Sequence, residues 1–349
     1  MTKKELSKKI LDRYTQDEWE ALEKDTLGVP VNKSNREVLL KFKEDSAALD
    51  DTSGRRRPSS RLFKGDVDDD AVSKLTDSLQ DFLSEVWADE PKAHKYVIDV
   101  CLIKTYIYDL PMHPEESVHY YTVVRDGKAE YYCPAKTDSL ICSCCRSKYC
   151  SELYQRWDEI TEETKTSKGE LSAKIQRQIF EAGLLESGVL DTKDLVFHQD
   201  VRTQCEKNQC GAYGTTWACP PAVGSLEECM DNIMKYNRFQ LFSKAYLLKD
   251  TMDMKEALSA MSNFKKCTRD LGKRLKEFDH DHIILSNESC DRCKKCTYPD
   301  SPCRFEEDLQ PSIEGFGFYV LELSRLADIK YINGQSTATF FGAVIYNEE

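Results

Sequence analysis

The residues in this chain with the clearest capacity for chemistry are its cysteines, of which there are 15 among 349 residues. Most of them fall in three groups, at 133–150, 205–229 and 290–303. Their number is odd, and the N-terminus lacks the apolar run of an export signal, so we expect a cytoplasmic chain with reduced thiols. Metal ligation therefore explains the grouped cysteines better than disulfide bonding does.

The third group has the most specific spacing. Cys290, Cys293 and Cys296 are separated by two residues each, and Cys303 follows six residues later. This spacing is typical of ferredoxin loops, in which thiolates and backbone N–H groups turn toward one compact cluster. The tail departs from the bacterial pattern, because six residues rather than three precede the last cysteine and Pro302 comes before it. A fourth ligand from elsewhere stays open, and zinc is the alternative, although a zinc CxxC pair would leave Cys290 redundant.

The second group places Cys205, Cys210 and Cys219 around a glycine-containing turn. Glycines let the backbone approach a bulky cofactor, and neighbouring aromatic side chains shield it from water. The fourth ligand is open: it is Cys229, a cysteine exchanged with the third group, or none, which would leave one iron free for a substrate. A turn with buried structural cysteines is the competing interpretation. The residues expected to contact the cofactor are Gly211, Tyr213, Gly214 and Trp217.

The first group matches no spacing that identifies one metal. We take Cys142, Cys145 and Cys150 as its candidate ligands. An iron–sulfur site, a zinc site and a redox-active thiol pair all stay open, because thiolates suit both metals. Cys101 and Cys267 lie apart from the groups in apolar-patterned segments, where we expect them to pack as small hydrophobic residues.

Together, the second and third groups resemble two signatures of a family of predicted metal-binding proteins of unknown function, common in anaerobic bacteria and archaea. The first signature is Cys205-x4-Cys210-Gly211-x-Tyr213-Gly214-x2-Trp217-x-Cys219-Pro220-Pro221. The second is Cys290-x2-Cys293-x2-Cys296-Thr297-Tyr298-Pro299, with Pro302-Cys303-Arg304, Pro311-Ser312 and Glu314-Gly315 downstream. The resemblance covers about residues 195–349. It implies iron–sulfur or similar metal binding in an anaerobic setting, and it implies no known reaction.

The pattern of apolar residues predicts the helices and strands around the first cysteine group. Amphipathic helices are predicted within 4–24, 35–48 and 72–88, with a flexible segment at 50–70. Residues 96–108 are rich in β-branched and aromatic side chains and are predicted to form a strand. Asp126-Gly127 between two apolar runs predicts a hairpin turn, so residues 95–133 should form a small antiparallel sheet. Residues 151–190 are predicted to be helical.

The elements around the other two groups alternate between strands and helices. Strands are predicted at 240–248, 283–285 and 339–346, a long amphipathic helix at 254–275, and an apolar helix at 313–329. The fold class is therefore α+β, with an α/β layer as an option for the C-terminal part. Three domains are expected: a helical region at 1–90, the small sheet with its helical connector at 91–190, and a metal-binding domain at 191–349.

Charge and missing motifs limit the function. A formal net charge of −12 disfavours nucleic acid and anionic membranes as partners, and no apolar run is long enough to span a membrane. The sequence contains no P-loop, no GxGxxG fingerprint and no CxxxCxxC loop of the radical-SAM type. We expect an electron-transfer or redox accessory protein with one or two [4Fe–4S] clusters, whose acidic charge would steer a basic partner.

Two other functions remain open. One is an iron–sulfur enzyme, an oxidoreductase or a lyase, that uses an open cluster iron on a small-molecule substrate. The other is a zinc-stabilised binding module. The sequence identifies no catalytic residue.

Overall fold

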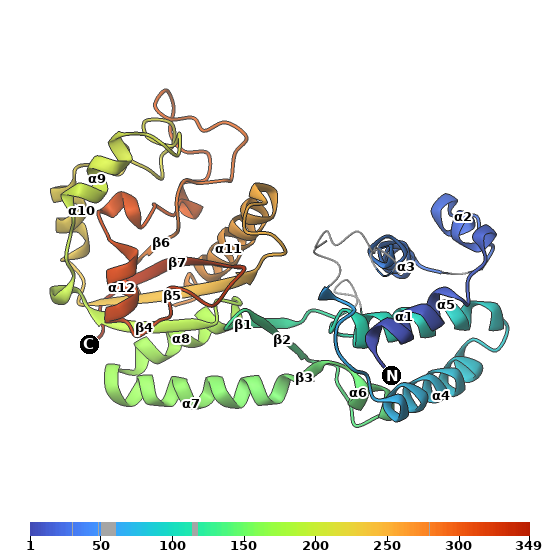
Figure 1. The fold of residues 1–349 in the computed structure, drawn as a ribbon. Coiled ribbons are helices and arrows are strands. Elements are labelled where there is room, and N and C mark those ends of the chain that lie inside the picture. Colours follow the sequence, from blue (N-terminus) through green and yellow to red (C-terminus); the bar gives the residue numbers. More distant parts are fainter. Residues whose placement is uncertain (30, 48, 50–60, 114–117, 279) are drawn as a thin grey trace. The chain divides into compact units, whose positions relative to one another are not determined.

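The computed structural model describes residues 1–29, 31–47, 49, 61–113, 118–278 and 280–349. The chain forms two compact units, which we describe separately. Unit 1 contains residues 1–121 and 131–151, and unit 2 contains residues 122–130 and 152–349 (Figure 1). Residues 50–60 of the predicted flexible segment lie outside the described part of the chain. No helix in the described ranges combines the length and apolar character that a membrane crossing requires.

Unit 1 is mainly helical. Local capping explains where its first helices begin: Thr2 with Glu5, and Thr15 with Glu18, form reciprocal capping boxes. One buried face of each helix contributes to a shared apolar core, in which Leu39 is fully buried. The helices are α1 (Lys3–Leu11), α2 (Gln16–Lys24), α3 (Lys33–Ser46), α4 (Asp69–Val86), α5 (Pro91–Leu102) and the π-helix η2 (Ile103–Ile107).

The strand predicted at 96–108 is wrong, because this segment is the end of α5 followed by η2. Pro91 stands in the first turn of α5, where its missing N–H costs nothing and its fixed φ favours a helix. Almost every side chain from Tyr96 to Ile107 is buried in unit 1. The β-branched residues therefore reflect burial around the helix and not a pleated strand.

A three-stranded sheet has the order β1-β2-β3, formed by β1 (Tyr121–Arg125), β2 (Lys128–Cys133) and β3 (Ser147–Tyr149). Asp126 and Gly127 both have positive φ and form the turn between β1 and β2. The prediction of a purely antiparallel sheet is wrong, because β3 pairs parallel to β2. The connection between them contains α6 (Leu140–Cys144) and is long enough for the crossover that parallel strands need.

Unit 2 is built on a sheet of order β4-β5-β7-β6, in which each neighbouring pair is antiparallel. This confirms the α+β class and excludes the optional parallel α/β layer for this sheet. The strands are β4 (Glu186–Asp191), β5 (Arg238–Leu247), β6 (His282–Leu285) and β7 (Thr337–Tyr346). The helices are α7 (Cys150–Lys168), α8 (Glu170–Glu181), α9 (Gln199–Glu206), α10 (Leu226–Ile233), α11 (Met254–Leu275), α12 (Val320–Leu326) and the 3-10 helices η3 (Thr192–Asp194), η4 (Glu306–Asp308) and η5 (Glu314–Phe316).

Two expectations for unit 2 require correction. The predicted apolar helix at 313–329 is two short pieces, η5 and α12, because Gly317 adopts a left-handed conformation between them. The helical prediction for 151–190 missed strand β4 at its end. The predicted strands at 240–248, 283–285 and 339–346 and the helix at 254–275 are confirmed.

The sheet of unit 2 separates two apolar cores. Phe239 and Phe318 are in edge-to-face contact on one side, in the core that also contains buried side chains of α10, α12 and η5. On the other side, Phe264 of α11 contacts Phe242 and Phe340. Because side chains alternate along a strand, β5 and β7 supply both cores, and the loops that carry cysteines leave from a rigid framework.

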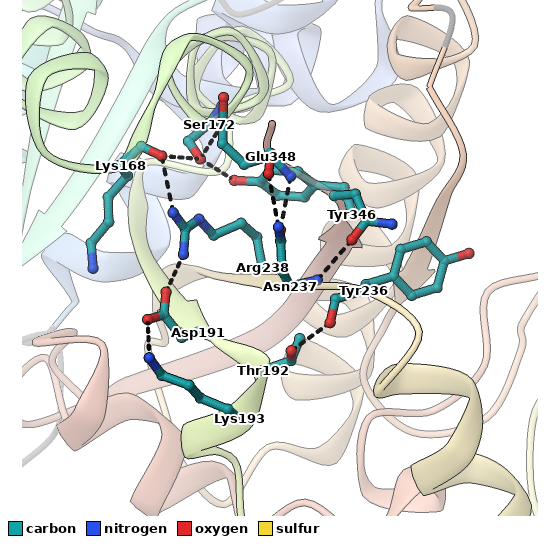
Figure 2. Close-up of polar contacts among 11 residues, drawn as sticks. Lys168, Ser172, Asp191, Thr192, Lys193, Tyr236, Asn237, Arg238, Tyr346 and Glu348 are labelled. Atoms are coloured by element: carbon teal, nitrogen blue, oxygen red, sulfur yellow. Dashed lines mark hydrogen bonds and ion pairs between the residues drawn. The ribbon is translucent and has the colours of Figure 1, made fainter.

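A polar network holds the C-terminal end of β7 against the start of α8 (Figure 2). Helix α8 has Gly169 at its N-cap position and so lacks a side-chain cap of its own. The Glu348 carboxylate replaces it by accepting hydrogen bonds from the N–H groups of Leu171, at 3.1 Å, and Ser172, at 2.6 Å. A negative charge at a helix N-terminus is favourable, so a residue distant in sequence stabilises α8.

Candidate metal centre

The four cysteines of the third group line one cavity of about 410 Å³ in the loop between β6 and η4. Each of the four residues is half-buried. The loop has no helix or strand of its own between Leu285 and Glu306. The separation of the thiols along the chain is therefore set by their sequence spacing and not by a regular element. The cysteines concerned are Cys290, Cys293, Cys296 and Cys303.

Backbone N–H groups already point at two of these sulfurs. The N–H of Arg292 donates to Cys290 Sγ at 3.4 Å, and the N–H of Phe305 donates to Cys303 Sγ at 3.4 Å. In both cases the donor lies two residues after the cysteine, so the first and last thiols of the group accept the same kind of local hydrogen bond. Such N–H···S bonds stabilise a thiolate and tune the metal that it holds.

Contacts with helix α11 hold the start of this loop in place. Asp291 accepts a hydrogen bond from the Ser262 hydroxyl at 3.0 Å and pairs with Arg269 at 2.6 Å. Lys265, which is almost fully buried, donates to the carbonyl of Ser289. Two charged side chains next to Cys290 therefore fix the loop to a long helix that is itself packed on the sheet.

The second group forms another wall of the same cavity. Its residues Gly214, Thr215, Thr216 and Trp217 line the cavity together with the four cysteines. Trp217 donates from Nε1 to the Ser301 carbonyl at 3.1 Å, and its ring meets Tyr298 edge-on with 4.9 Å between centroids. The sequence interpretation of Trp217 as a shield for a cofactor stays a prediction, and the structure places the residue between the two cysteine groups.

The three cysteines of the second group differ in exposure. Cys205 lies in the last turn of α9 and is half-buried, Cys210 is exposed, and Cys219 is buried. Burial raises the pKa of Cys219 to about 11, and burial is also the main cause of the raised pKa of Cys205. A nearby cation or metal would be needed to keep both of these sulfurs in the thiolate form at neutral pH.

The backbone conformation at two positions of the second group favours glycine over any other residue. Gly211 and Gly214 have φ values of 76° and 69°, in the left-handed region that glycine occupies without strain. An added Cβ at either position would meet nothing within 4 Å, so there is open space beside both of them. The N–H of Tyr213, a residue predicted to contact a cofactor, donates a hydrogen bond to Asn208 Oδ1 at 3.0 Å.

One residue near this group was not identified from the sequence as a ligand. Glu314, the first residue of η5, is half-buried and influences the protonation of both Cys205 and Cys219. Burial raises the pKa of the Glu314 carboxyl above its usual range. No spacing rule connects a carboxylate to thiols about a hundred residues earlier, so only the fold could reveal it. Cys229, weighed above as a fourth ligand, is on α10 and is fully buried in the core.

The first group lies in unit 1 and is divided between two environments. Cys150 and Cys133 are both buried, and the pKa of Cys150 is raised by burial and then by Cys133. Cys145 Sγ accepts from the Met112 N–H at 3.3 Å. Burial alone would raise the pKa of Cys142, but hydrogen bonds from Ser139 and Thr137 outweigh it and lower that pKa.

The described residues contain no preformed site for a single ion. No three histidine, cysteine, aspartate or glutamate side chains among them are close enough together to hold one metal. Four thiolates on one zinc ion, each about 2.3 Å from the metal, would be only about 3.8 Å apart.

Comparisons with known proteins relate one segment of unit 2 to a family. Residues 188–346 match the model of a family described as predicted metal-binding protein (DUF2284). The matched segment includes the second and third cysteine groups and Glu314, and it excludes the first group. The family resemblance inferred from the two signatures is confirmed for this segment. No curated protein and no solved structure was found to match the chain.

Proposed function

We propose that unit 2 binds two iron–sulfur clusters of the [4Fe–4S] type and transfers electrons as a redox accessory protein. The third cysteine group would hold one cluster and the second group the other. The observation that carries this proposal is the cavity lined by Cys290, Cys293, Cys296 and Cys303, with backbone N–H groups directed at the first and last sulfurs. The proximity of Trp217 in the opposite wall supports a path between the two groups.

The residues of the loop have separable roles. A bound cluster would supply reversible one-electron chemistry, and the protein would determine its position and its potential. The Arg292 and Phe305 N–H groups stabilise sulfur negative charge, and the Arg292 guanidinium stacks on the Phe305 ring at 4.6 Å. Trp217 and Tyr298, in edge-on contact, would exclude water from one side of the cavity. The half-buried thiols keep the centre close enough to the surface for electron exchange with a docked protein.

Metal analysis of protein purified without oxygen tests this proposal directly. We expect brown protein that contains about eight irons and about eight acid-labile sulfides per chain, because each [4Fe–4S] cluster contains four of each. Colourless protein that contains zinc and no sulfide would contradict both the clusters and the electron-transfer role. About four irons per chain would show that only one of the two groups binds a cluster.

The mouth of the cavity is basic although the whole chain is acidic. Residues 290–305 contain four basic and two acidic side chains, and one of the acidic ones, Asp291, is paired with Arg269. Lys294 and Lys295 line the cavity, are exposed, and form no ion pair with other described residues. This local charge favours an acidic electron carrier at the third group, rather than the basic partner suggested by the net charge.

We expect the double variant Lys294→Glu/Lys295→Glu to accept electrons from a small acidic ferredoxin about tenfold more slowly at low ionic strength. The difference should shrink as salt is added, because screening weakens charge steering. Stopped-flow absorption measures the rate. The matched control is Lys255→Glu/Lys266→Glu on α11, two exposed lysines that do not line the cavity. An equal effect of both double variants would reject a docking role for the cavity mouth.

A further inference from the structure

We propose that Glu314 is the fourth ligand of the centre bound by Cys205, Cys210 and Cys219, with a carboxylate oxygen in place of a fourth thiolate. This assignment rests on the proposed function, because it requires a cluster at the second group. It answers the question left by the sequence, in which three cysteines stand together without a clear fourth.

The chain on both sides of Glu314 is in contact with the segments that carry the thiols. The N–H of Ser312 donates to the carbonyl of Ala218, next to Cys219, at 2.8 Å. A Cβ added at Gly315 would stand 3.2 Å from Pro220 Cδ. Arg202, three residues before Cys205 on α9, donates to the Gly315 carbonyl. The backbone therefore fixes Glu314 between the end of α9 and the turn at 218–220.

Hydrogen bonds orient the Glu314 carboxylate, but no basic side chain among the described residues pairs with its charge. Its Oε2 accepts hydrogen bonds from the Glu288 N–H at 3.1 Å and the Ser312 hydroxyl at 3.0 Å. An ionised carboxylate has about four acceptor positions, so these two bonds leave room for a metal. Among the described residues, no lysine or arginine forms an ion pair with Glu314. Even a half-buried carboxylate is unfavourable without a neighbouring cation, and a cluster iron would supply that positive charge.

The alternative fourth ligands are occupied elsewhere in the fold. Cys229 is fully buried, and its Sγ donates to the Val223 carbonyl at 3.3 Å. Cys303 lines the cavity of the third group and accepts the Phe305 N–H. His198, the nearest histidine in the sequence, is bonded through Nε2 to Glu322 at 2.6 Å. Glu314, whose charge influences both Cys205 and Cys219, has ligand capacity that its two hydrogen bonds leave unused.

An oxygen ligand would give one iron of this centre a distinct chemistry. The iron of a cluster prefers the soft sulfur of a thiolate as its ligand. A carboxylate oxygen is a harder ligand and is displaced more readily. A small donor molecule could therefore replace Glu314 on that iron, while the other three irons stay held by cysteine. The second centre would differ in this way from the third, which has four cysteines.

Cyanide titration of the complete, anaerobically purified protein tests the assignment. In Glu314→Gln and Glu314→Ala the corner iron has lost its protein ligand, so cyanide should bind at about one tenth of the concentration required by the wild type. Electron paramagnetic resonance of the reduced clusters reports the binding. Glu314→Gln keeps the size of the side chain and an acceptor oxygen for Ser312 and Glu288, which limits its effect on folding.

The control is Glu288→Gln, which removes a neighbouring exposed carboxylate without removing the proposed ligand. We expect it to titrate like the wild type. Loss of about half the iron from Glu314→Gln, with an unchanged circular dichroism spectrum, would also support the assignment. Identical cyanide titrations of the wild type and both Glu314 variants, with full iron content, would overturn it. Wild-type protein without iron and sulfide would instead reject the clusters themselves.

Discussion

Replacing Cys293 with alanine is expected to remove about four irons and about four sulfides per chain, together with the absorption of one cluster. Cys293 is the middle thiol of the spacing that defines the third group, and it lines the cavity with the other three cysteines. A cluster that has lost one thiolate keeps an exposed iron, and in a half-buried site this iron is open to solvent. Iron and sulfide analysis of anaerobically purified protein measures the loss.

The matched control is Cys267→Ala. Cys267 lies in α11 of the same unit and is half-buried beside Lys244, outside all three cysteine groups. Its replacement should leave iron and sulfide at the wild-type level. The variant Cys303→Ala should behave like Cys293→Ala if the last cysteine is a ligand in spite of its unusual spacing. Full iron content in Cys293→Ala would show that the third group holds no cluster.

The two cysteine groups could be found from the sequence because their chemistry is local. Cys290, Cys293 and Cys296 lie within seven consecutive residues, so their spacing limits the geometry before any folding occurs. The positions of Gly211 and Gly214 were informative for the same reason, since a left-handed conformation belongs to one residue at a time. Metal binding by this part of the chain is supported by the family match over residues 188–346.

The parts of the fold that sequence reasoning missed depend on contacts between distant residues. The composition of 96–108 favours a strand, but burial on all sides within unit 1 makes it a helix. Glu314 is about a hundred residues from Cys205 in the sequence. The segments that carry them are connected only in the fold, by the Ser312 N–H donating to the Ala218 carbonyl and by the Arg202 guanidinium donating to the Gly315 carbonyl. The wall formed by Trp217 and Tyr298 likewise exists only after folding.

Arg202 connects the second cysteine group to the rest of unit 2. Its side chain is only 7% exposed. Its Nη2 donates to the Gly224 carbonyl at 2.7 Å, and its Nη1 donates to the Gly315 carbonyl. One planar guanidinium therefore joins α9, the turn before α10 and η5. No other residue type presents donors in this fixed fork, so lysine is not equivalent here.

We expect Arg202→Met to lower the free energy of unfolding by about 2–4 kcal/mol, because one buried and one partly buried carbonyl lose their donor. The same change should release the iron of the second centre, since Cys205 and Glu314 are positioned by the segments that Arg202 joins. Urea denaturation followed by circular dichroism measures stability, and metal analysis measures the iron. Arg202→Lys should fall between the wild type and Arg202→Met, because one ammonium cannot replace both bonds well.

Arg177→Met is the control for removing an arginine as such. Arg177 is more exposed and pairs with Asp158 and Glu181 near the surface of α8, where ion pairs contribute about 1 kcal/mol or less. Equal losses of stability in the two methionine variants would show that the hydrogen bonds of Arg202 stabilise the fold no more than surface ion pairs do. A loss of about half the iron in Arg202→Met alone would instead locate the damage at the second centre. The third cysteine group is held separately, by the contacts of Asp291 with Ser262 and Arg269 of α11, and its proposed cluster is expected to stay bound.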